Sequence, residues 1–94
     1  MRIIWTDEAV GTLEAITTYV AAFNPDAATK LAGQPMALAD SLADFPHRGR
    51  DAGEGQREMT TVWPYILRYR VVDGAVLISR VRHVARDKDE AGVG

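Results

Sequence analysis

The strongest candidates for chemistry lie near the C-terminus, in the run Arg80-Val81-Arg82-His83-Val84-Ala85-Arg86. An imidazole changes charge near neutral pH, so His83 among arginines could act as a general acid or base on a phosphodiester. The alternative is a packed histidine at the end of a strand, held by one hydrogen bond. The residues alone leave both interpretations open.

A second candidate is the pair Arg57 and Glu58, which lies in a segment with strand propensity. Neighbouring residues of a strand point to opposite faces, so a direct ion pair between the two is not expected and one of them should serve another purpose. Trp63, Tyr65 and Tyr69 could stack on nucleobases. A small core needs several aromatic side chains, however, and we therefore expect these three in the core.

Charge is distributed unevenly along the chain. Residues 1–46 carry two basic and six acidic side chains, whereas residues 47–86 carry eight arginines, four acids and no lysine. Arginine without lysine is typical of planar, forked contacts to carboxylate or phosphate. It is equally expected for a solvated strand face in a protein from a GC-rich genome, so the charge pattern does not decide between these two explanations.

Two consecutive helices are predicted in the first half. Thr6 is a suitable N-cap, and the apolar positions Leu13, Ile16, Val20 and Phe23 follow at helical spacing. Asn24-Pro25 ends this helix and opens the next, which has its own apolar stripe and stops at Pro46. That second stripe consists of Ala28, Leu31, Leu38, Leu42 and Phe45. Pro35 interrupts the second helix and should bend it without dividing it, because the stripe keeps its register.

Strands are predicted at residues 2–5, 57–62, 65–72 and 76–85, with a loop at 47–56 and a frayed tail at 87–94. Asp73-Gly74 indicates a two-residue type I′ hairpin turn. Counting from this turn places Leu67 opposite Arg80, so a bulge near Ser79 is needed to bring Val81 to the core face. The order β-α-α-β-β-β predicts an α+β fold in which an antiparallel helical hairpin covers one face of an antiparallel sheet.

Length and composition exclude several classes of protein. The 94 residues suit one domain, which we place at residues 1–86. There is no cysteine, and two histidines do not suggest a metal site, so no metal and no cofactor are expected. No membrane-spanning run and no signal peptide is recognisable, which favours a cytoplasmic protein without membrane contact.

Fragments in a fixed order give the chain a family resemblance. They are Trp5-Thr6, Tyr19-Val20, Asn24-Pro25 with Ala27-Ala28, Leu42-x-x-Phe45-Pro46-x-x-Gly49-Arg50, Arg57-Glu58, Tyr65-Ile66-Leu67-Arg68-Tyr69-Arg70-Val71 and Ile78-x-Arg80-Val81-Arg82-His83-x-Ala85-Arg86. Taken together, these fragments resemble the RelE/ParE superfamily of toxins from type II toxin–antitoxin systems, also called plasmid-stabilisation proteins.

The resemblance implies one of two activities. RelE-like members are ribosome-dependent mRNA endonucleases with an arginine early in the third strand, whereas ParE-like members are associated with inhibition of DNA gyrase. In this chain Ile66 stands at the position of the nuclease arginine. An isoleucine cannot bind a phosphate, so the resemblance favours a ParE-like gyrase inhibitor with no catalytic residues. A third possibility is a degenerate member that binds its antitoxin and poisons nothing.

The same resemblance implies the site residues and partners. A nuclease would use Arg57, Arg68, His83 and Arg86. The candidate target-binding residues are Arg68, Arg70, Arg80, Arg82, His83 and Arg86. The candidate antitoxin-binding residues are Leu13, Ile16, Val20, Arg57 and Arg70. The expected partner is a ParD-like antitoxin with a ribbon-helix-helix domain and a tail that folds on binding, in a higher-order complex with the toxin.

Overall fold

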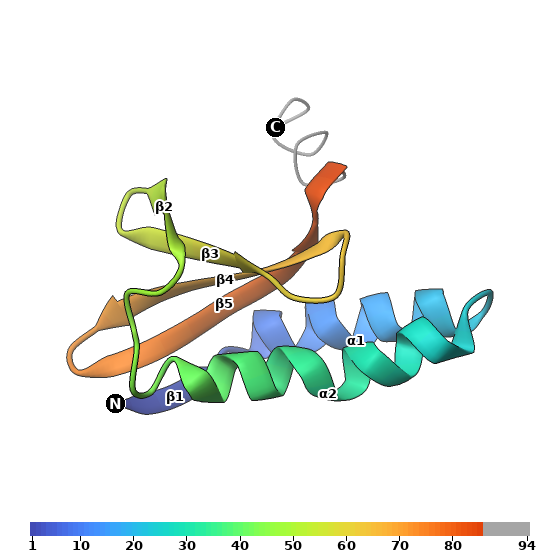
Figure 1. Cartoon of the computed structure of the whole chain (residues 1–94), viewed down its shortest axis with the longest axis horizontal. Coiled ribbons are helices and arrows are strands. Elements are labelled where there is room, and N and C mark those ends of the chain that lie inside the picture. Colours follow the sequence, from blue (N-terminus) through green and yellow to red (C-terminus); the bar gives the residue numbers. More distant parts are fainter. Residues whose placement is uncertain (86–94) are drawn as a thin grey trace.

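The computed structural model describes residues 1–85, which form a five-stranded sheet with two helices on one of its faces (Figure 1). The elements are β1 (Arg2–Trp5), α1 (Asp7–Ala21), α2 (Pro25–Ser41), β2 (Arg50–Gly53), β3 (Gln56–Thr60), β4 (Tyr65–Val72) and β5 (Ala75–His83). The strand order in the sheet is β1-β5-β4-β3-β2. The predicted α+β class and helical hairpin are confirmed. Arg86 and the predicted tail at 87–94 lie outside the described residues.

Both helices begin at the residues that the sequence indicates. The Thr6 Oγ1 accepts a hydrogen bond from the Ala9 amide at 3.0 Å, and the Asn24 Oδ1 accepts one from the Ala27 amide at 3.1 Å. Each cap satisfies an amide that has no partner within the helix. α2 runs without interruption through Pro35, so the prediction of one helix instead of two is confirmed.

The sheet has one strand more than predicted, and one of its pairings is parallel. β2 forms within the predicted loop because Gly53, Glu54 and Gly55 all adopt positive φ and reverse the chain tightly. β1 pairs with β5 in parallel, with Arg2 opposite Ala75 and Trp5 opposite Ile78. The pairs β2–β3, β3–β4 and β4–β5 are antiparallel.

The last hairpin confirms both predictions made for it. Asp73 and Gly74 have φ of 50° and 75°, as a type I′ turn requires. The register shifts between Arg68 and Tyr69 on β4, where Ser79 on β5 is the extra residue, and Leu67 therefore lies opposite Val81. This bulge keeps apolar side chains on the helix face of both strands.

The core lies between the helices and the sheet. Leu31, Leu42, Leu67, Tyr69 and Ile78 are fully buried there. The prediction of a core position was correct for Tyr65 and Tyr69 and wrong for three other aromatic residues, which are exposed: Phe23, Phe45 and Trp63. These three sit in turns or just after a helix, where periodicity along a helix or strand no longer determines which way a side chain points.

Candidate functional site

The alternation of β3, β4 and β5 gives the sheet two chemically different faces. The helix face carries the apolar core, including Leu67, Tyr69 and Val81. We call the opposite face of these strands the open face. A row of charged residues crosses it: Arg50 pairs with Glu58, Glu58 with Arg68, and Arg68 with Arg80. Residues directly opposite on neighbouring strands have adjacent side chains on one face, so this register gathers the charges.

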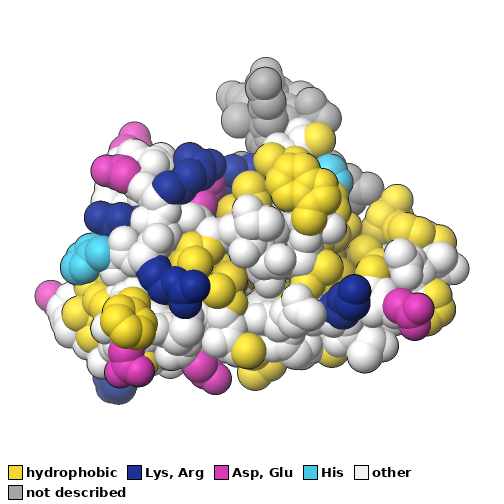
Figure 2. Space-filling view, in the orientation of Figure 1, with side chains coloured by type: hydrophobic (Ala, Val, Ile, Leu, Met, Phe, Trp, Pro, Cys, Tyr) yellow, Lys and Arg dark blue, Asp and Glu magenta, His cyan; other side chains and the backbone are white. Residues whose placement is uncertain are grey.

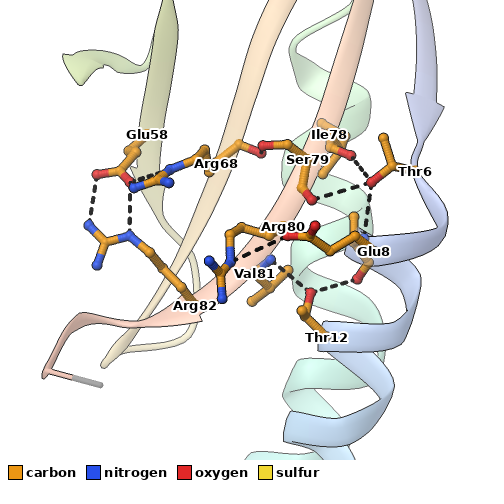
Figure 3. A network of polar contacts seen from close by, with 11 residues as sticks. Thr6, Glu8, Thr12, Glu58, Arg68, Ile78, Ser79, Arg80, Val81 and Arg82 are labelled. Atoms are coloured by element: carbon orange, nitrogen blue, oxygen red, sulfur yellow. Dashed lines mark hydrogen bonds and ion pairs between the residues drawn. The ribbon is translucent and has the colours of Figure 1, made fainter. Parts of the chain in front are cut away.

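Glu58 is the centre of this row, and its residue is only 3% exposed. Its Oε1 accepts hydrogen bonds from Arg50 Nη2 at 2.8 Å and Arg82 Nη2 at 2.9 Å. Its Oε2 accepts from Arg68 Nε and Arg82 Nε, both at 2.9 Å. Figure 3 shows the Arg68 and Arg82 guanidiniums converging on the carboxylate. We call Glu58, Arg50, Arg68 and Arg82 the Glu58 cluster.

The Glu58 cluster draws on four strands and fixes the charge of its carboxylate. Hydrogen bonds from Arg82 hold the pKa of Glu58 below its ordinary value of 4.5; burial acts in the opposite direction, and Arg68 lowers the pKa further. The ionised carboxylate and three guanidiniums leave a net charge of +2 on the cluster. Arg82 contacts both carboxylate oxygens, and a two-bond contact of this kind adds geometric specificity.

β5 extends beyond the end of β1. Side chains of α1 and of its N-cap residue form hydrogen bonds with this part of the β5 backbone. The Val81 amide donates to Thr12 Oγ1 at 3.1 Å, and Thr6 Oγ1 donates to the Ile78 carbonyl at 3.0 Å. Next to this edge the Arg80 Nε lies 3.7 Å from Glu8 Oε2 (Figure 3). Arg80 therefore joins the open face to the N-terminal end of α1.

Arg57, the neighbour of Glu58, points to the other face. Its Nη1 donates to the carbonyls of Gly49 at 2.7 Å and His47 at 3.2 Å. The Tyr69 hydroxyl secures the same loop, because it accepts from the Gly49 amide and donates to the Pro46 carbonyl, both at 2.8 Å. The expectation that Arg57 and Glu58 would serve different purposes is confirmed.

His83 lies at the opposite end of the helix face. Its ring meets that of Tyr65 edge-on, with centroids 5.3 Å apart, and its Nδ1 accepts from the Ala85 amide at 3.0 Å. Both rings line a pocket of about 330 Å³ that also touches Phe23 and Trp63. Figure 2 shows exposed hydrophobic side chains over this part of the surface.

The structure therefore separates the residues that a nuclease would use. Arg68 lies on the open face, Arg57 on the helix face beside the loop at 46–49, and His83 on the helix face beside Tyr65. Ile66 is on the open face, opposite Arg82, and is 6% exposed. Within residues 1–85, Arg57, Arg68 and His83 do not converge on one point from which they could act on one phosphodiester.

The candidate target-binding residues are brought together in part. Arg68, Arg80 and Arg82 share the open face, and Arg70 lies on the same face of β4, where its Nη2 is 3.5 Å from the Glu54 carbonyl. Arg50 and Glu58 complete the group and were missing from the sequence-based set. The alternation of β3 placed Glu58 on the face opposite Arg57, but its cross-strand partners depend on register, which the sequence did not fix.

A second candidate surface is an apolar groove of about 700 Å³ formed mainly by α1 and α2. Its walls are Trp5, Val10, Leu13, Glu14, Thr17, Thr18, Ala32 and Met36. Leu13 is thus the one predicted antitoxin-binding residue that lines this groove. Ile16 packs against the core and Val20 is buried in it. Arg57 and Arg70 belong to the sheet, away from this groove.

Residues 1–85 contain no group of three or more histidine, aspartate or glutamate side chains arranged to hold a metal ion. None of the helices in this range is both long and apolar enough to cross a membrane.

Comparisons with known proteins agree with this architecture. Residues 3–88 match the model of the ParE toxin of the type II toxin–antitoxin system parDE. Toxin RelE2 of Caulobacter vibrioides is 46% identical over 85 residues, which cover 90% of this chain and 97% of that protein. Toxin RelE1 of the same bacterium is 35% identical over 63 residues, covering 64% and 68%.

A solved structure matches as well. A chain of the chromosomal ParDE toxin–antitoxin system from P. aeruginosa superposes with a TM-score of 0.77 and 25% identity, over 89% of this chain and 96% of that one. The order of elements, the sheet with helices on one face and the sequence match all agree. The chain belongs to the ParE toxin family of type II toxin–antitoxin systems, within the RelE/ParE superfamily.

Proposed function

We propose that this toxin acts in the cytoplasm by binding a protein target, DNA gyrase, and does not hydrolyse RNA. The observation that supports this proposal most strongly is the separation of Arg57, Arg68 and His83 over two faces and both ends of the sheet. General acid–base chemistry needs its groups within hydrogen-bonding reach of one substrate. In addition, the resemblance to the superfamily implies that Ile66 occupies the position of the nuclease arginine.

A supercoiling assay tests the target. Purified toxin at micromolar concentration should inhibit gyrase-catalysed supercoiling, and the inhibition should disappear when a cognate antitoxin is added. Unchanged gyrase activity would contradict the proposal. Primer extension on translated mRNA tests the endonuclease alternative: new cleavage ends that vanish with His83→Ala would favour a RelE-like nuclease instead.

The antitoxin side of the proposal rests on the helix groove. We propose that an apolar segment of a ParD-like antitoxin folds into it and covers Val10, Leu13 and Met36. Val10 and Met36 line the groove and are 41% and 51% exposed, so they present apolar surface that a partner could cover. Binding that orders a flexible tail would then use a largely preformed surface.

Co-purification tests this groove. Met36→Asp should greatly reduce capture of the toxin by a tagged antitoxin, because a charge would be buried at the interface. Phe45→Asp is the matched control, since Phe45 is also exposed and does not line the groove. Equal loss of capture with both variants, or no loss with either, would contradict this assignment of the groove.

A further inference from the structure

We propose that a pocket at one end of the molecule binds an arginine side chain of a protein partner, and that aromatic rings hold its guanidinium. The pocket has a volume of about 330 Å³ and lies where the α1–α2 turn meets the β3–β4 turn and the end of β5 (Figure 1). We call it the aromatic pocket. It shares no wall with the helix groove or the Glu58 cluster, so the inference does not depend on the proposed target or on the proposed antitoxin groove.

The first argument is the composition of the walls. The whole chain has two tryptophans, three tyrosines and two phenylalanines, and four of these residues line the aromatic pocket together with His83. They are Tyr19, Phe23, Trp63 and Tyr65. Among the described residues that line the helix groove, by contrast, Trp5 alone is aromatic. The face of an aromatic ring is negative, so walls of this kind attract a cation as well as an apolar group.

The second argument is the arrangement of the rings. Tyr19 meets Phe23 edge-on, with ring centroids 5.3 Å apart and ring planes at 76°. Tyr65 meets His83 in the same way, at 5.3 Å and 84°. In an edge-on pair, one ring keeps both of its faces clear of its neighbour. Phe23 and Trp63 are also 65% and 69% exposed, so a planar guanidinium can stack on rings at the surface while the methylene groups of the arginine contact apolar walls.

The third argument is charge. Of the described residues that line the aromatic pocket, none is an arginine, lysine, aspartate or glutamate. His83 accepts a hydrogen bond at Nδ1, as a neutral imidazole does. The whole chain carries a net charge of −2 and therefore attracts cations at long range. A nucleobase could also stack on the rings, but its phosphates would be repelled by this net charge, so these features favour a cation over a nucleic acid.

The fourth argument concerns the source of the cation. Pockets for small molecules typically bury about 70–90% of the surface of their ligand. Here Tyr19, Phe23 and Trp63 are all more than half exposed, so a free small molecule would stay largely in contact with water. A side chain that projects from a protein is instead covered by the surface that carries it. Tryptophan, tyrosine and arginine are also the residue types enriched where protein interfaces gain most of their binding energy.

The two tryptophans of the chain provide the test, because each gives one indole N–H signal in a proton–nitrogen correlation spectrum. Trp63→Phe identifies the Trp63 signal by its loss. The probe is N-acetylarginine amide, titrated into the full chain at constant ionic strength. We expect a saturable shift of the Trp63 signal in the millimolar range, and binding at least about threefold weaker for N-acetylcitrulline amide, a neutral analogue of the same shape. Equal binding of the two probes would overturn the proposal.

Trp5 distinguishes this site from simple attraction of a cation by acidic side chains. Trp5 lines the helix groove together with Glu14, where charge attraction alone would draw the probe. Trp63 lines a pocket to which no described residue contributes a carboxylate. The Trp63 signal should therefore move while the Trp5 signal stays in place. A larger shift of the Trp5 signal than of the Trp63 signal would overturn the assignment.

Phe23→Leu tests the contribution of a ring at an exposed position, where the substitution does not disturb the core. Leucine keeps an apolar side chain and removes one aromatic face, so binding of N-acetylarginine amide should weaken about two- to fivefold. Phe45→Leu is the matched control, because Phe45 is also 65% exposed and does not line the aromatic pocket. It should bind the probe unchanged. Equal binding by the two variants would show that the ring of Phe23 does not hold the cation.

Three further measurements on the Trp63 signal test other occupants of the aromatic pocket. Tighter binding of adenosine than of N-acetylarginine amide would assign the pocket to a nucleobase. Tighter binding of free arginine than of its blocked form would assign it to a small molecule. Movement of the signal on dilution of the chain without any probe would assign it to a second copy of the chain. Each of these results would overturn the proposal.

Discussion

The two faces of the β3–β4 pair differ in what their polar side chains do, although they arise from alternate residues of the same strands. On the helix face, Arg57 and Tyr69 bind backbone groups of the loop at 46–49. On the open face, Glu58 binds only other side chains. Contacts to the backbone fix the chain path, whereas contacts among surface side chains fix a charge distribution. The polar side chains of the helix face therefore hold a loop in place, and those of the open face hold one another.

The largest expected effect comes from crowding the helix face. A Cβ on Gly49 would lie 2.7 Å from the Tyr69 hydroxyl oxygen and 2.8 Å from its ring. Tyr69 is fully buried and cannot move aside, so Gly49→Ala should lower the free energy of unfolding by about 2–3 kcal/mol. Urea denaturation measures this change.

Gly33→Ala is the control for that substitution. A Cβ on Gly33 meets no atom within 4 Å, and the residue is inside α2. Alanine favours a helix over glycine, so the variant should be more stable by about 0.5–1 kcal/mol. Equal destabilisation by both variants would show that the close approach at Gly49 does not matter to the fold.

An intermediate effect is expected from acid, through the open face. Because the folded pKa of Glu58 lies below its ordinary 4.5, the unfolded chain takes up a proton first as the pH falls. The stability that Glu58 contributes is therefore complete above about pH 4.5 and is lost as the pH falls through the lower folded pKa. Glu58→Gln should lower stability at pH 7 by about 2 kcal/mol, and by less in acid.

Urea unfolding at pH 7 and at pH 3 distinguishes this from a general acid effect. The difference in stability between Glu58→Gln and the unmodified chain should shrink at the lower pH. Both chains are compared at the same pH, so a general effect of acid on the fold cancels in this difference. A constant difference at both pH values would mean that Glu58 gives no stability through its charge.

The smallest effect on stability is expected for Arg50→Ala. The Arg50 side chain is 65% exposed, and ion pairs in contact with water contribute little. The free energy of unfolding should change by less than about 1 kcal/mol, which urea denaturation measures. A larger loss would contradict the expectation that this exposed ion pair adds little to the stability of the open face.

Much of the fold followed from local patterns. The caps at Thr6 and Asn24, the type I′ turn at Asp73-Gly74 and the bulge at Ser79 are all specified by a few neighbouring residues. β2 was missed because three consecutive positive-φ residues allow a strand to form where composition indicates a loop. The exposed positions of Phe23, Phe45 and Trp63 were also missed, since hydrophobicity does not determine exposure in turns.

The site was less predictable than the fold. The run of arginines in the second half, and the opposite orientation of Arg57 and Glu58, could be read from alternation. The convergence of Arg50, Arg68 and Arg82 on one carboxylate could not, because these residues come from three strands whose mutual register is set by turns and a bulge. The charge composition predicted an excess of positive charge in this part of the chain, but it did not predict which side chains contact one another.

By itself, the sequence determined both helices, every strand except β2, the family and the excess of arginine over acid in residues 47–86, because these properties depend on residue types and short-range spacing. The tertiary structure decided which arginines meet Glu58, and that a nuclease-like set would be divided between two faces. The physical reason is the period of a strand: moving the register by one residue turns every side chain to the other face, so tertiary pairing determines whether the same charges bind each other, the backbone or a partner.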